Sequence, residues 1–307
     1  MKMLKDFINE LKGTERKSDN TINSYMKDIR AYESWLMDTE KKEFEQTTVE
    51  DIKAYMAYLS TDCVGMGNKK GLAPTTVNRK VSSLQKAFDF LIEKGVANEN
   101  PAKSVKRQKT DKNKKPSFMI EEEVEMFLGA IQNDERRGIK PEAKVRDYAL
   151  MRLMIATGLR VSEACSLTVK NFNFRRKELT VIGKGNKSRT LPLSDTIIKI
   201  IKDYLEIRNN FKPTCDALFV SKQGNNTKPR DVNKMIKTYC EIAGLNPEEF
   251  HAHSLRHTCA TLTYKHNQGN LRAVQEQLGH SNIGTTQIYT QLVGDALRRS
   301  AMANPFA

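Results

Sequence analysis

Long hydrophobic runs are missing from this sequence, and cysteines are few. No window of eighteen or more apolar residues occurs in the 307-residue chain, whose mean hydropathy is −0.60, so no membrane-spanning helix is predicted. An odd number of scattered cysteines argues against a disulfide framework and fits a reducing compartment; the five are Cys63, Cys165, Cys215, Cys240 and Cys259. Asp6 and Glu10 interrupt the apolar pattern near the N-terminus, which the core of a signal peptide does not tolerate. We therefore expect a cytoplasmic protein.

Familiar metal-binding motifs are also lacking. The sequence has no C-x-x-C pair, no H-E-x-x-H motif and no convincing cluster of carboxylates that could hold two metal ions. His253 and His257 do have a ligand spacing, with Cys259 nearby, so a metal site at this point is the weaker alternative. We expect a protein that uses neither a metal nor another cofactor.

Negative charge is in deficit, and the deficit is uneven. The chain has 51 Lys and Arg against 37 Asp and Glu, a net charge of +14 and a pI near 9.5, which favours a polyanionic partner. Residues 1–105 hold 17 cations against 16 anions, residues 106–117 hold six against one, and the remainder holds 28 against 20. Any DNA contact made by the first part must therefore come from cations gathered on one side.

The first hundred residues predict an all-helical unit. Apolar residues recur at helical spacing in four segments, at about residues 4–13, 20–37, 48–59 and 74–95. Thr47 or Thr48 is expected to cap the third helix. Arg79, Lys80 and Lys86 lie on the polar face of the fourth, a face that either contacts DNA or is simply solvated.

Residues 106–117, K-R-Q-K-T-D-K-N-K-K-P-S, predict a linker. The stretch is polar, has no apolar periodicity and reaches a proline near its end. Six cations on such a strand can follow a phosphate backbone, and a linker between two globular parts suits a clamp around a duplex. A tether that only improves solubility is the alternative.

The residues after the linker predict further helices. We expect helices at about residues 121–131 and 141–157, the second ending at Gly158 as its C-cap. Arg160 stands in the next turn, where it can point into a cleft. Ser162 is expected to cap a short helix that begins at Glu163, and Glu163 is near enough in sequence to orient Arg160.

A hairpin and a basic helix follow. Two β-type runs in E-L-T-V-I-G-K-G-N-K-S-R-T-L-P-L predict a hairpin with Lys184 at its tip, between two glycines. An ammonium there can donate a proton to a departing alkoxide, although an ordinary exposed lysine is the plainer interpretation. Further along, Lys228, Arg230 and Lys234 lie on the polar face of a predicted helix and are candidate phosphate contacts.

The strongest cluster of reactive residues lies between positions 253 and 289. His253 and Arg256 are three apart, so on a helix both project from one face. His280 and Tyr289 follow. A phenol near imidazoles and a guanidinium suits attack on a phosphate, because the attacking oxygen loses a proton while the phosphoryl oxygens gain charge.

Five motifs, taken in order, carry a family resemblance. They are T-G-L-R-V-S-E, G-K-G-N-K-S-R, H-S-L-R-H-T-C-A-T, L-G-H-S and T-T-Q-I-Y-T. In this order and spacing the chain resembles the tyrosine recombinases, or phage integrase family, and most of all its compact Xer-type members. The resemblance spans about residues 118–291.

The resemblance implies a fold and a set of site residues. The fold is mainly α with a small β-hairpin or sheet, in two domains: a helical, SAM-like core-binding domain at residues 1–105 and, after the linker of 106–117, a tyrosine-recombinase catalytic domain at 118–307. The implied catalytic residues are Arg160, Lys184, His253, Arg256, His280 and the nucleophile Tyr289, with Glu163 supporting Arg160.

The resemblance also implies an activity and its partners. The chain is expected to be a site-specific DNA recombinase that cuts and rejoins DNA through a 3′-phosphotyrosyl intermediate, without metal or ATP, as four protomers on two DNA sites. Two alternatives use the same fold: a type IB topoisomerase that relaxes supercoils, and a DNA-binding regulator without catalysis.

Overall fold

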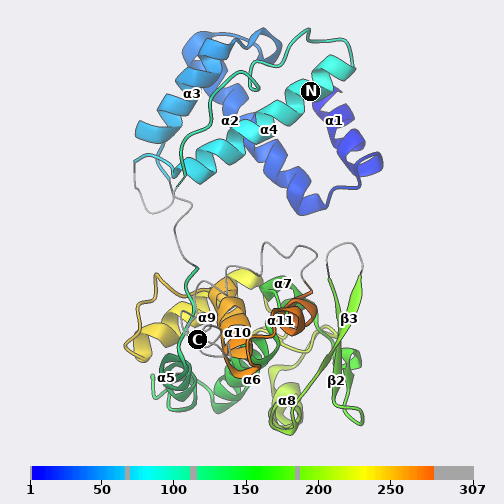
Figure 1. The fold of residues 1–307 in the computed structure, drawn as a ribbon, viewed down its shortest axis with the longest axis vertical. Helices are drawn as coiled ribbons and strands as arrows, with labels where there is room; N and C mark the ends of the chain where they lie inside the picture. The colour runs from blue at the N-terminus through cyan, green and yellow to red at the C-terminus, as the bar shows by residue number, and fades with distance from the viewer. Residues whose placement is uncertain (1, 66–69, 111–115, 184–186, 280–307) are drawn as a thin grey trace, which may run out of the picture. The chain divides into compact units, whose positions relative to one another are not determined.

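Figure 1 shows the computed structural model of the chain, which describes residues 2–65, 70–110, 116–183 and 187–279. The chain divides into two compact units, Met1–Asn113 and Lys114–Ala307. Both are mainly helical, and the second adds a three-stranded sheet, so the predicted fold class is confirmed. Within the described ranges, no helix combines the length and the apolar character needed to cross a membrane.

The described part of the first unit is built from helices. Their bounds are α1 (Lys2–Gly13), α2 (Asp19–Glu40), the 3-10 helix η1 (Phe44–Gln46), α3 (Val49–Thr61) and α4 (Pro74–Glu93). The four helices predicted from apolar spacing are therefore confirmed. Pro74 opens α4, where its fixed φ suits a first helical turn and its missing N–H costs no hydrogen bond.

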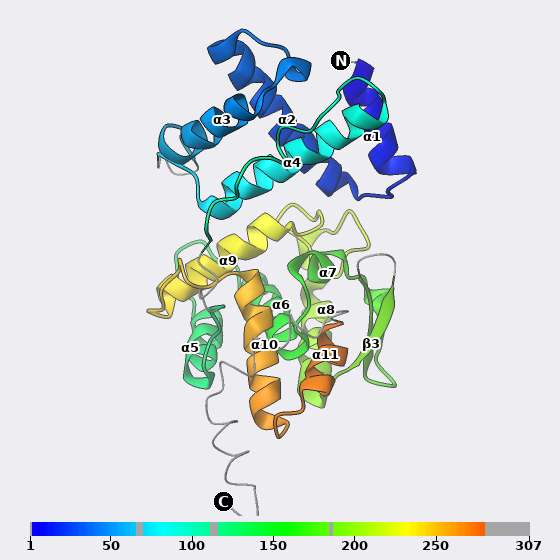
Figure 2. The ribbon, with the colours of Figure 1, turned by 45° about the horizontal axis from the view of Figure 1, so that its top comes forward.

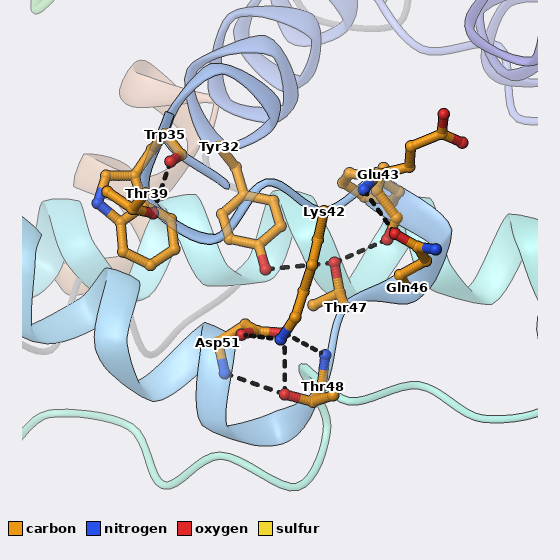
Figure 3. Close-up of polar contacts among 10 residues, drawn as sticks. Tyr32, Trp35, Thr39, Lys42, Glu43, Gln46, Thr47, Thr48 and Asp51 are labelled. Carbon is orange, nitrogen blue, oxygen red and sulfur yellow. Dashed lines mark hydrogen bonds and ion pairs between the residues drawn. The ribbon is translucent and has the colours of Figure 1, made fainter. Parts of the chain in front are cut away.

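A capping box fixes the start of α3. Thr48 Oγ1 accepts a hydrogen bond from the Asp51 N–H at 3.3 Å, and the Asp51 carboxylate accepts one from the Thr48 N–H at 2.8 Å (Figure 3). Lys42 Nζ adds an ion pair with Asp51 at 2.8 Å. The N-cap predicted at Thr47 or Thr48 is thus Thr48.

Aromatic rings join the helices of the first unit. Tyr32 of α2 meets Tyr55 of α3 edge-on with ring centroids 4.9 Å apart, and Phe44 of η1 stacks on Phe88 of α4 at 4.6 Å. All four rings are buried. Such pairs add about 0.5–1.5 kcal/mol each beyond the burial of their area, so they favour one packing of α2, α3 and α4.

The first residues of the basic stretch lie on α4. Arg107 Nη1 donates to the Asn78 carbonyl at 2.6 Å, and the Gln108 N–H donates to Asn78 Oδ1 at 2.9 Å. Asn78 Nδ2 returns a hydrogen bond to the Gln108 carbonyl at 2.9 Å. The chain is therefore fastened to the first unit up to residue 108.

The second unit contains helices and one small sheet. Its described elements are α5 (Glu121–Gln132), α6 (Pro141–Thr157), α7 (Val161–Ser166), η2 (Val169–Asn171), β1 (Phe172–Asn173), β2 (Glu178–Ile182), β3 (Ser188–Pro192), α8 (Asp195–Ile207), η3 (Arg208–Phe211), α9 (Pro229–Ile242), α10 (Ala252–His266) and α11 (Leu271–Leu278). Ten of the 17 residues of α6 are buried, and the helix packs against α5, α8 and α10 (Figure 2).

The predicted hairpin is confirmed. Strands β2 and β3 pair antiparallel with Thr180 opposite Thr190, and β1 adds to the other edge of β2. The sheet lies at the side of the unit away from α5 (Figure 1). Leu179, Val181 and Leu191 point into the core, as the period of two residues along a strand requires.

Gly158 ends α6 where three elements meet. Its φ of +64° is the left-handed conformation that favours glycine at a helix end. A Cβ at this position would lie 2.5 Å from Leu278 Cδ2 and 3.1 Å from Cys259 Sγ. The predicted C-cap is therefore confirmed, and the absence of a side chain lets α10 and α11 approach the end of α6.

The chain enters the second unit along α10. Ser117 Oγ donates to the Glu249 carbonyl at 2.7 Å, and the Met119 N–H donates to Thr258 Oγ1 of α10 at 2.8 Å. Met119 and Thr258 are both buried. These bonds tie the segment that precedes α5 to residues more than a hundred positions later.

Candidate active site

Arg160 lies at the N-terminus of α7, directly after the end of α6. It is the N-cap residue of that helix, and its backbone N–H donates to Glu163 Oε2 at 2.9 Å. Its Nη1 donates to Glu163 Oε1 at 3.0 Å, so Glu163 does orient Arg160 as predicted. The prediction that Ser162 caps a helix starting at Glu163 is wrong: α7 begins at Val161, and the Glu163 carboxylate reaches back to the cap instead.

Glu163 has a second partner that the sequence analysis did not assign. Arg189 of β3 donates from Nη2 to Glu163 Oε2 at 2.8 Å and from Nη1 to Oε1 at 3.1 Å. Glu163 is buried, and Arg189 is largely covered. A sequence signal was present, because Arg189 shares the inward face of β3 with the buried Leu191.

The electrostatics of this carboxylate follow from its partners. Burial acts to raise the pKa of Glu163, but the hydrogen bonds and positive charge of Arg189, together with those of Arg160, outweigh it and hold the pKa below its ordinary value. Glu163 is therefore ionised at neutral pH and fixes two guanidinium groups beside each other.

The α10 helix presents a row of imidazoles. The His253 and His257 ring centroids lie 4.5 Å apart, and those of His251 and His253 lie 6.4 Å apart. His253 is exposed as a residue, but the protein on one side of its ring desolvates the imidazole, and this lowers the pKa of His253. The charges of Arg256 and Arg160 lower the pKa further. A neutral imidazole can accept a proton, so His253 is a candidate general base.

Arg256 lies inside the unit, one turn along from His253. It is 1% exposed, and it donates from Nη1 to the Gly158 carbonyl at 2.6 Å and from Nη2 to the Leu278 carbonyl at 2.7 Å. Both acceptors are at helix ends, of α6 and α11, where carbonyls lack a partner within the helix. Arg256 thus joins α10 to the turn that carries Arg160 and to the end of α11.

Three of the predicted catalytic residues lie outside the described residues: Lys184, His280 and Tyr289. Their neighbours in sequence can still be located. Gly183 comes directly before Lys184 and Gly279 directly before His280, and both lie against Arg189: a Cβ at Gly279 would be 3.0 Å from Arg189 Cδ, and one at Gly183 would be 3.5 Å from Arg189 Nη1.

The predicted DNA contacts of α4 are held by carboxylates. Arg79 donates from both terminal nitrogens to Asp28 of α2, and Lys80 Nζ lies 3.2 Å from Asp28 Oδ1. Lys86 Nζ pairs with Glu15 at 2.5 Å. Asp28 was missed from the sequence, although it lies on the buried side of α2 with Ile29, a placement that signals a buried partner.

The predicted DNA contacts of α9 are arranged as the sequence indicates. Lys228, Arg230 and Lys234 are exposed, whereas Val232 and Ile236 are buried on the opposite side of the helix. No structural observation tests whether either set of cations contacts DNA, so both remain predictions.

A metal site is the alternative use of the α10 histidines. Over the part of the chain that the structure describes, no three His, Cys, Asp or Glu side chains are grouped so that they could hold a metal ion. Burial raises the pKa of the Cys259 thiol to about 12, so the thiol stays protonated at neutral pH.

Known families match both units. Residues 117–294 match the Phage integrase family, and residues 4–95 match the Phage integrase, N-terminal SAM-like domain. The first match covers more than half of the chain. The chain belongs to the phage integrase family.

Curated relatives of this phage integrase family member cover nearly its whole length. Tyrosine recombinase XerC of Caldanaerobacter subterraneus subsp. tengcongensis is 31% identical over 325 residues, which is 99% of this chain and 87% of the relative. Tyrosine recombinase XerC of Haemophilus influenzae is 34% identical over 275 residues, which is 90% of this chain and 87% of the relative. The chain is thus an Xer-like tyrosine recombinase, which is a site-specific DNA recombinase, as the five motifs predicted.

Solved structures agree on the fold. The XerH site-specific recombinase bound to its difH substrate, a pre-cleavage complex, is 26% identical with a TM-score of 0.68, covering 94% of this chain and 80% of that one. The Tn1549 transposon integrase in complex with transposon right end DNA has a TM-score of 0.73 at 20% identity, covering 98% of both chains, and at that identity it shows the fold alone.

Proposed function

We propose that this recombinase cuts and rejoins duplex DNA through a covalent 3′-phosphotyrosyl bond to Tyr289, without a metal ion or ATP. The observation that supports the proposal best is the gathering of Arg160, His253 and Arg256 near the end of α6. Arg256 donates to the carbonyl of Gly158, the C-cap of α6, Arg160 follows Gly158 by two residues, and His253 stands one turn before Arg256 on α10. The XerH relative, solved on its own substrate before cleavage, supports DNA as the partner.

Strand cleavage would be an in-line substitution at one backbone phosphorus. Tyr289 Oη forms the new bond to phosphorus while its proton passes to His253. The bond from phosphorus to the 5′ oxygen breaks, and Lys184 gives that oxygen a proton, which leaves a 5′-hydroxyl. Rejoining is the reverse with a hydroxyl from another strand. The ester keeps the energy of the broken bond, so no ATP is needed.

Charge on the nonbridging oxygens would be met by guanidinium groups. A guanidinium is a planar fork of N–H donors, which suits an oxyanion whose charge grows in the transition state. Arg160 is part exposed and offers such donors directly. Arg256 donates to the Gly158 and Leu278 carbonyls in this structure, so it would exchange one of these bonds for the phosphate when DNA binds. His280 is assigned as an additional donor to the same phosphate. These cations take the place that metal ions hold in two-metal nucleases, so we expect cleavage to continue in EDTA.

The two units would divide the work. We assign DNA-site binding to a helical core-binding domain of residues 1–105, with Arg79, Lys80 and Lys86 as its phosphate contacts. We assign catalysis to residues 118–307, with Lys228, Arg230 and Lys234 as further phosphate contacts. Within the basic stretch of residues 106–117, the part after Gln108 would link them. By its Xer resemblance the enzyme works in the cytoplasm as four protomers on two DNA sites.

A nicked suicide duplex from DNA flanking the native gene tests this function. Cleavage of the nicked strand close to the nick releases a short 5′-hydroxyl fragment, which diffuses away and is not religated, so the adduct accumulates and survives denaturant. We expect mass spectrometry to place the adduct on Tyr289, with EDTA present or absent. Tyr289→Phe should abolish the adduct while leaving duplex binding within about twofold, because a single hydroxyl is removed.

Three outcomes would contradict the proposal. An adduct on another residue would remove Tyr289 from its role. A strict Mg²⁺ requirement would point to a different mechanism. Relaxation of a supercoiled plasmid by the monomer, with no exchange between paired sites, would favour a type IB topoisomerase.

A further inference from the structure

Arg189 belongs to the G-K-G-N-K-S-R motif, and the proposed mechanism gives it no role. It comes from β3, whereas Glu163 comes from α7, and the two are 26 residues apart in sequence. Its fork donates to both carboxylate oxygens, at 2.8 and 3.1 Å, in the parallel arrangement that gives an arginine–carboxylate pair its geometric specificity.

The Arg160 contact alone leaves the Glu163 carboxylate underdetermined. Arg160 supplies its backbone N–H to one oxygen and Nη1 to the other, and both of these donors come from the same turn as Glu163. A carboxyl group turns readily about its last side-chain bond. The planar fork of Arg189, anchored on a separate strand, fixes the plane of the carboxylate, and with it the direction in which Arg160 Nη1 is held.

Arg189 also contacts the residues that adjoin two other catalytic positions. Its Cδ lies 3.0 Å from where a Cβ of Gly279 would stand, and its Nη1 lies 3.5 Å from that of Gly183. Those glycines directly precede His280 and Lys184. A single side chain therefore meets Glu163, the end of strand β2 and the end of α11.

We propose that Arg189 is a positioning residue for strand cleavage: through Glu163 it aims the Arg160 guanidinium at the scissile phosphate. The proposal rests on the recombinase function above. Arg189 contacts no substrate in this role, so its loss should slow the chemical step and leave DNA affinity nearly unchanged. The effect should depend on the charge of the nonbridging oxygens, because that charge is what Arg160 meets.

The test compares Arg189→Gln and Arg189→Lys with wild type on the suicide duplex. At saturating duplex, we expect Arg189→Gln to lower the single-turnover cleavage rate about 100-fold, the scale of a misplacement near 1 Å, with the Kd within about twofold. Arg189→Lys keeps the charge and loses the fork, so its loss should be smaller, about tenfold. Arg176→Gln, an exposed arginine between β1 and β2 that pairs with Glu178, is the matched control and should cleave at the wild-type rate.

A second substrate separates positioning from simple destabilisation. A methylphosphonate at the scissile position removes the negative charge that Arg160 meets. Wild type should cleave the phosphate much faster than the methylphosphonate. In Arg189→Gln, the ratio of these two cleavage rates should be at least fivefold smaller. An equal fall in the cleavage rate of both substrates would overturn the proposal, and so would a cleavage rate within twofold of wild type. A weaker Kd with an unchanged rate would also overturn it, because Arg189 would then be a DNA contact.

The controls keep the two proposals apart. If Arg189→Gln unfolds below the assay temperature, the proposal is tested with the folded Arg189→Lys variant, by the same ratio of phosphate to methylphosphonate cleavage rates. If wild type forms no Tyr289 adduct on the suicide duplex, the proposed function fails first. If wild type reacts and Arg189→Gln reacts equally well, the positioning role alone is lost.

Discussion

The two units contain the same local arrangement, a buried carboxylate that holds two cations. In the first unit, Asp28 is 1% exposed and holds Arg79, half exposed at 49%, and Lys80, mostly covered at 12%. In the second unit, Glu163 is 5% exposed and holds Arg160, 41% exposed, and Arg189, covered at 15%. Each carboxylate thus presents one cation to the surface and keeps another inside.

The difference lies in where the partners come from. Arg79 and Lys80 are neighbours on α4, so the Asp28 contact mainly joins two helices. Arg160 and Arg189 come from a helix start and a strand, beside Gly183 and Gly279. We infer that disturbing the first cluster costs stability and DNA affinity, whereas disturbing the second costs catalytic rate.

Glu163→Gln should give the largest effect. The amide keeps the size of the side chain but turns an N–H₂ group toward the guanidiniums, so both arginines lose their orientation. We expect single-turnover cleavage of the suicide duplex to fall about 100-fold or more at saturating DNA, with the Kd changed by less than about threefold. A rate close to wild type would show that disturbing the Glu163 cluster does not lower the catalytic rate.

Asp28→Asn should mainly change stability. Removing the charge leaves Lys80 covered without its counter-ion, and breaking a buried pair in this way costs about 3 kcal/mol. Urea unfolding followed by circular dichroism would measure the loss. Asp38→Asn, an exposed aspartate on the same helix, is the control and should stay within about 0.5 kcal/mol. The cleavage rate of Asp28→Asn at saturating DNA should remain within about twofold of wild type. A large fall in this rate would show that the Asp28 and Glu163 clusters do not differ in their effect on catalysis.

The pH dependence of the unfolding free energy should show the contribution of Glu163 to stability directly. Its pKa is lower in the folded state than in the unfolded chain, so the unfolded state binds more protons as the pH falls. The stability contributed by Glu163 is therefore fully present above about pH 4.3, the ordinary glutamate value, and is lost as the pH falls through the lower folded value. The gap in unfolding free energy between wild type and Glu163→Gln should be constant from pH 7 to 5 and shrink below pH 4. A gap that widens in acid would contradict the sign of this shift.

Helix periods and caps carried most of the fold prediction. Thr48 and Gly158 stand where local chemistry alone requires a cap, so the sequence located those helix ends. The hairpin and the pairing of Arg160 with Glu163 were likewise within reach of local spacing. The cap of α7 was predicted wrongly because Ser162 is a common cap residue, while the structure uses the Glu163 carboxylate.

Contacts between distant elements were not predictable from spacing. The Asp28 pair with Arg79 spans 51 residues and the Glu163 pair with Arg189 spans 26, and no local rule links such positions. The helical or strand period could only have flagged Asp28 and Arg189 as polar residues on buried faces. Arg256 shows the same limit: its spacing from His253 was read correctly, but not its burial against Gly158 and Leu278 carbonyls.

Arg79→Gln should give the smallest effect. Its guanidinium is half exposed, so Lys80 and Ser83 can keep Asp28 satisfied when it is lost. If Arg79 contacts a phosphate, the slope of log K against log salt should become about one unit shallower, with stability changed by less than about 1 kcal/mol. Binding titrations at several salt concentrations would measure it. An unchanged slope would assign Arg79 to the structure of the first unit alone.

The hydrogen bond from Met119 to Thr258 limits where the chain can be divided. Thr258 stands two residues beyond Arg256, on the helix that also carries His253. A separately expressed C-terminal half that started after Met119 would strip a buried hydroxyl of its donor in the middle of that helix. Fragment design should therefore begin the second half no later than Ser117, so that both this bond and the one from Ser117 to Glu249 are retained.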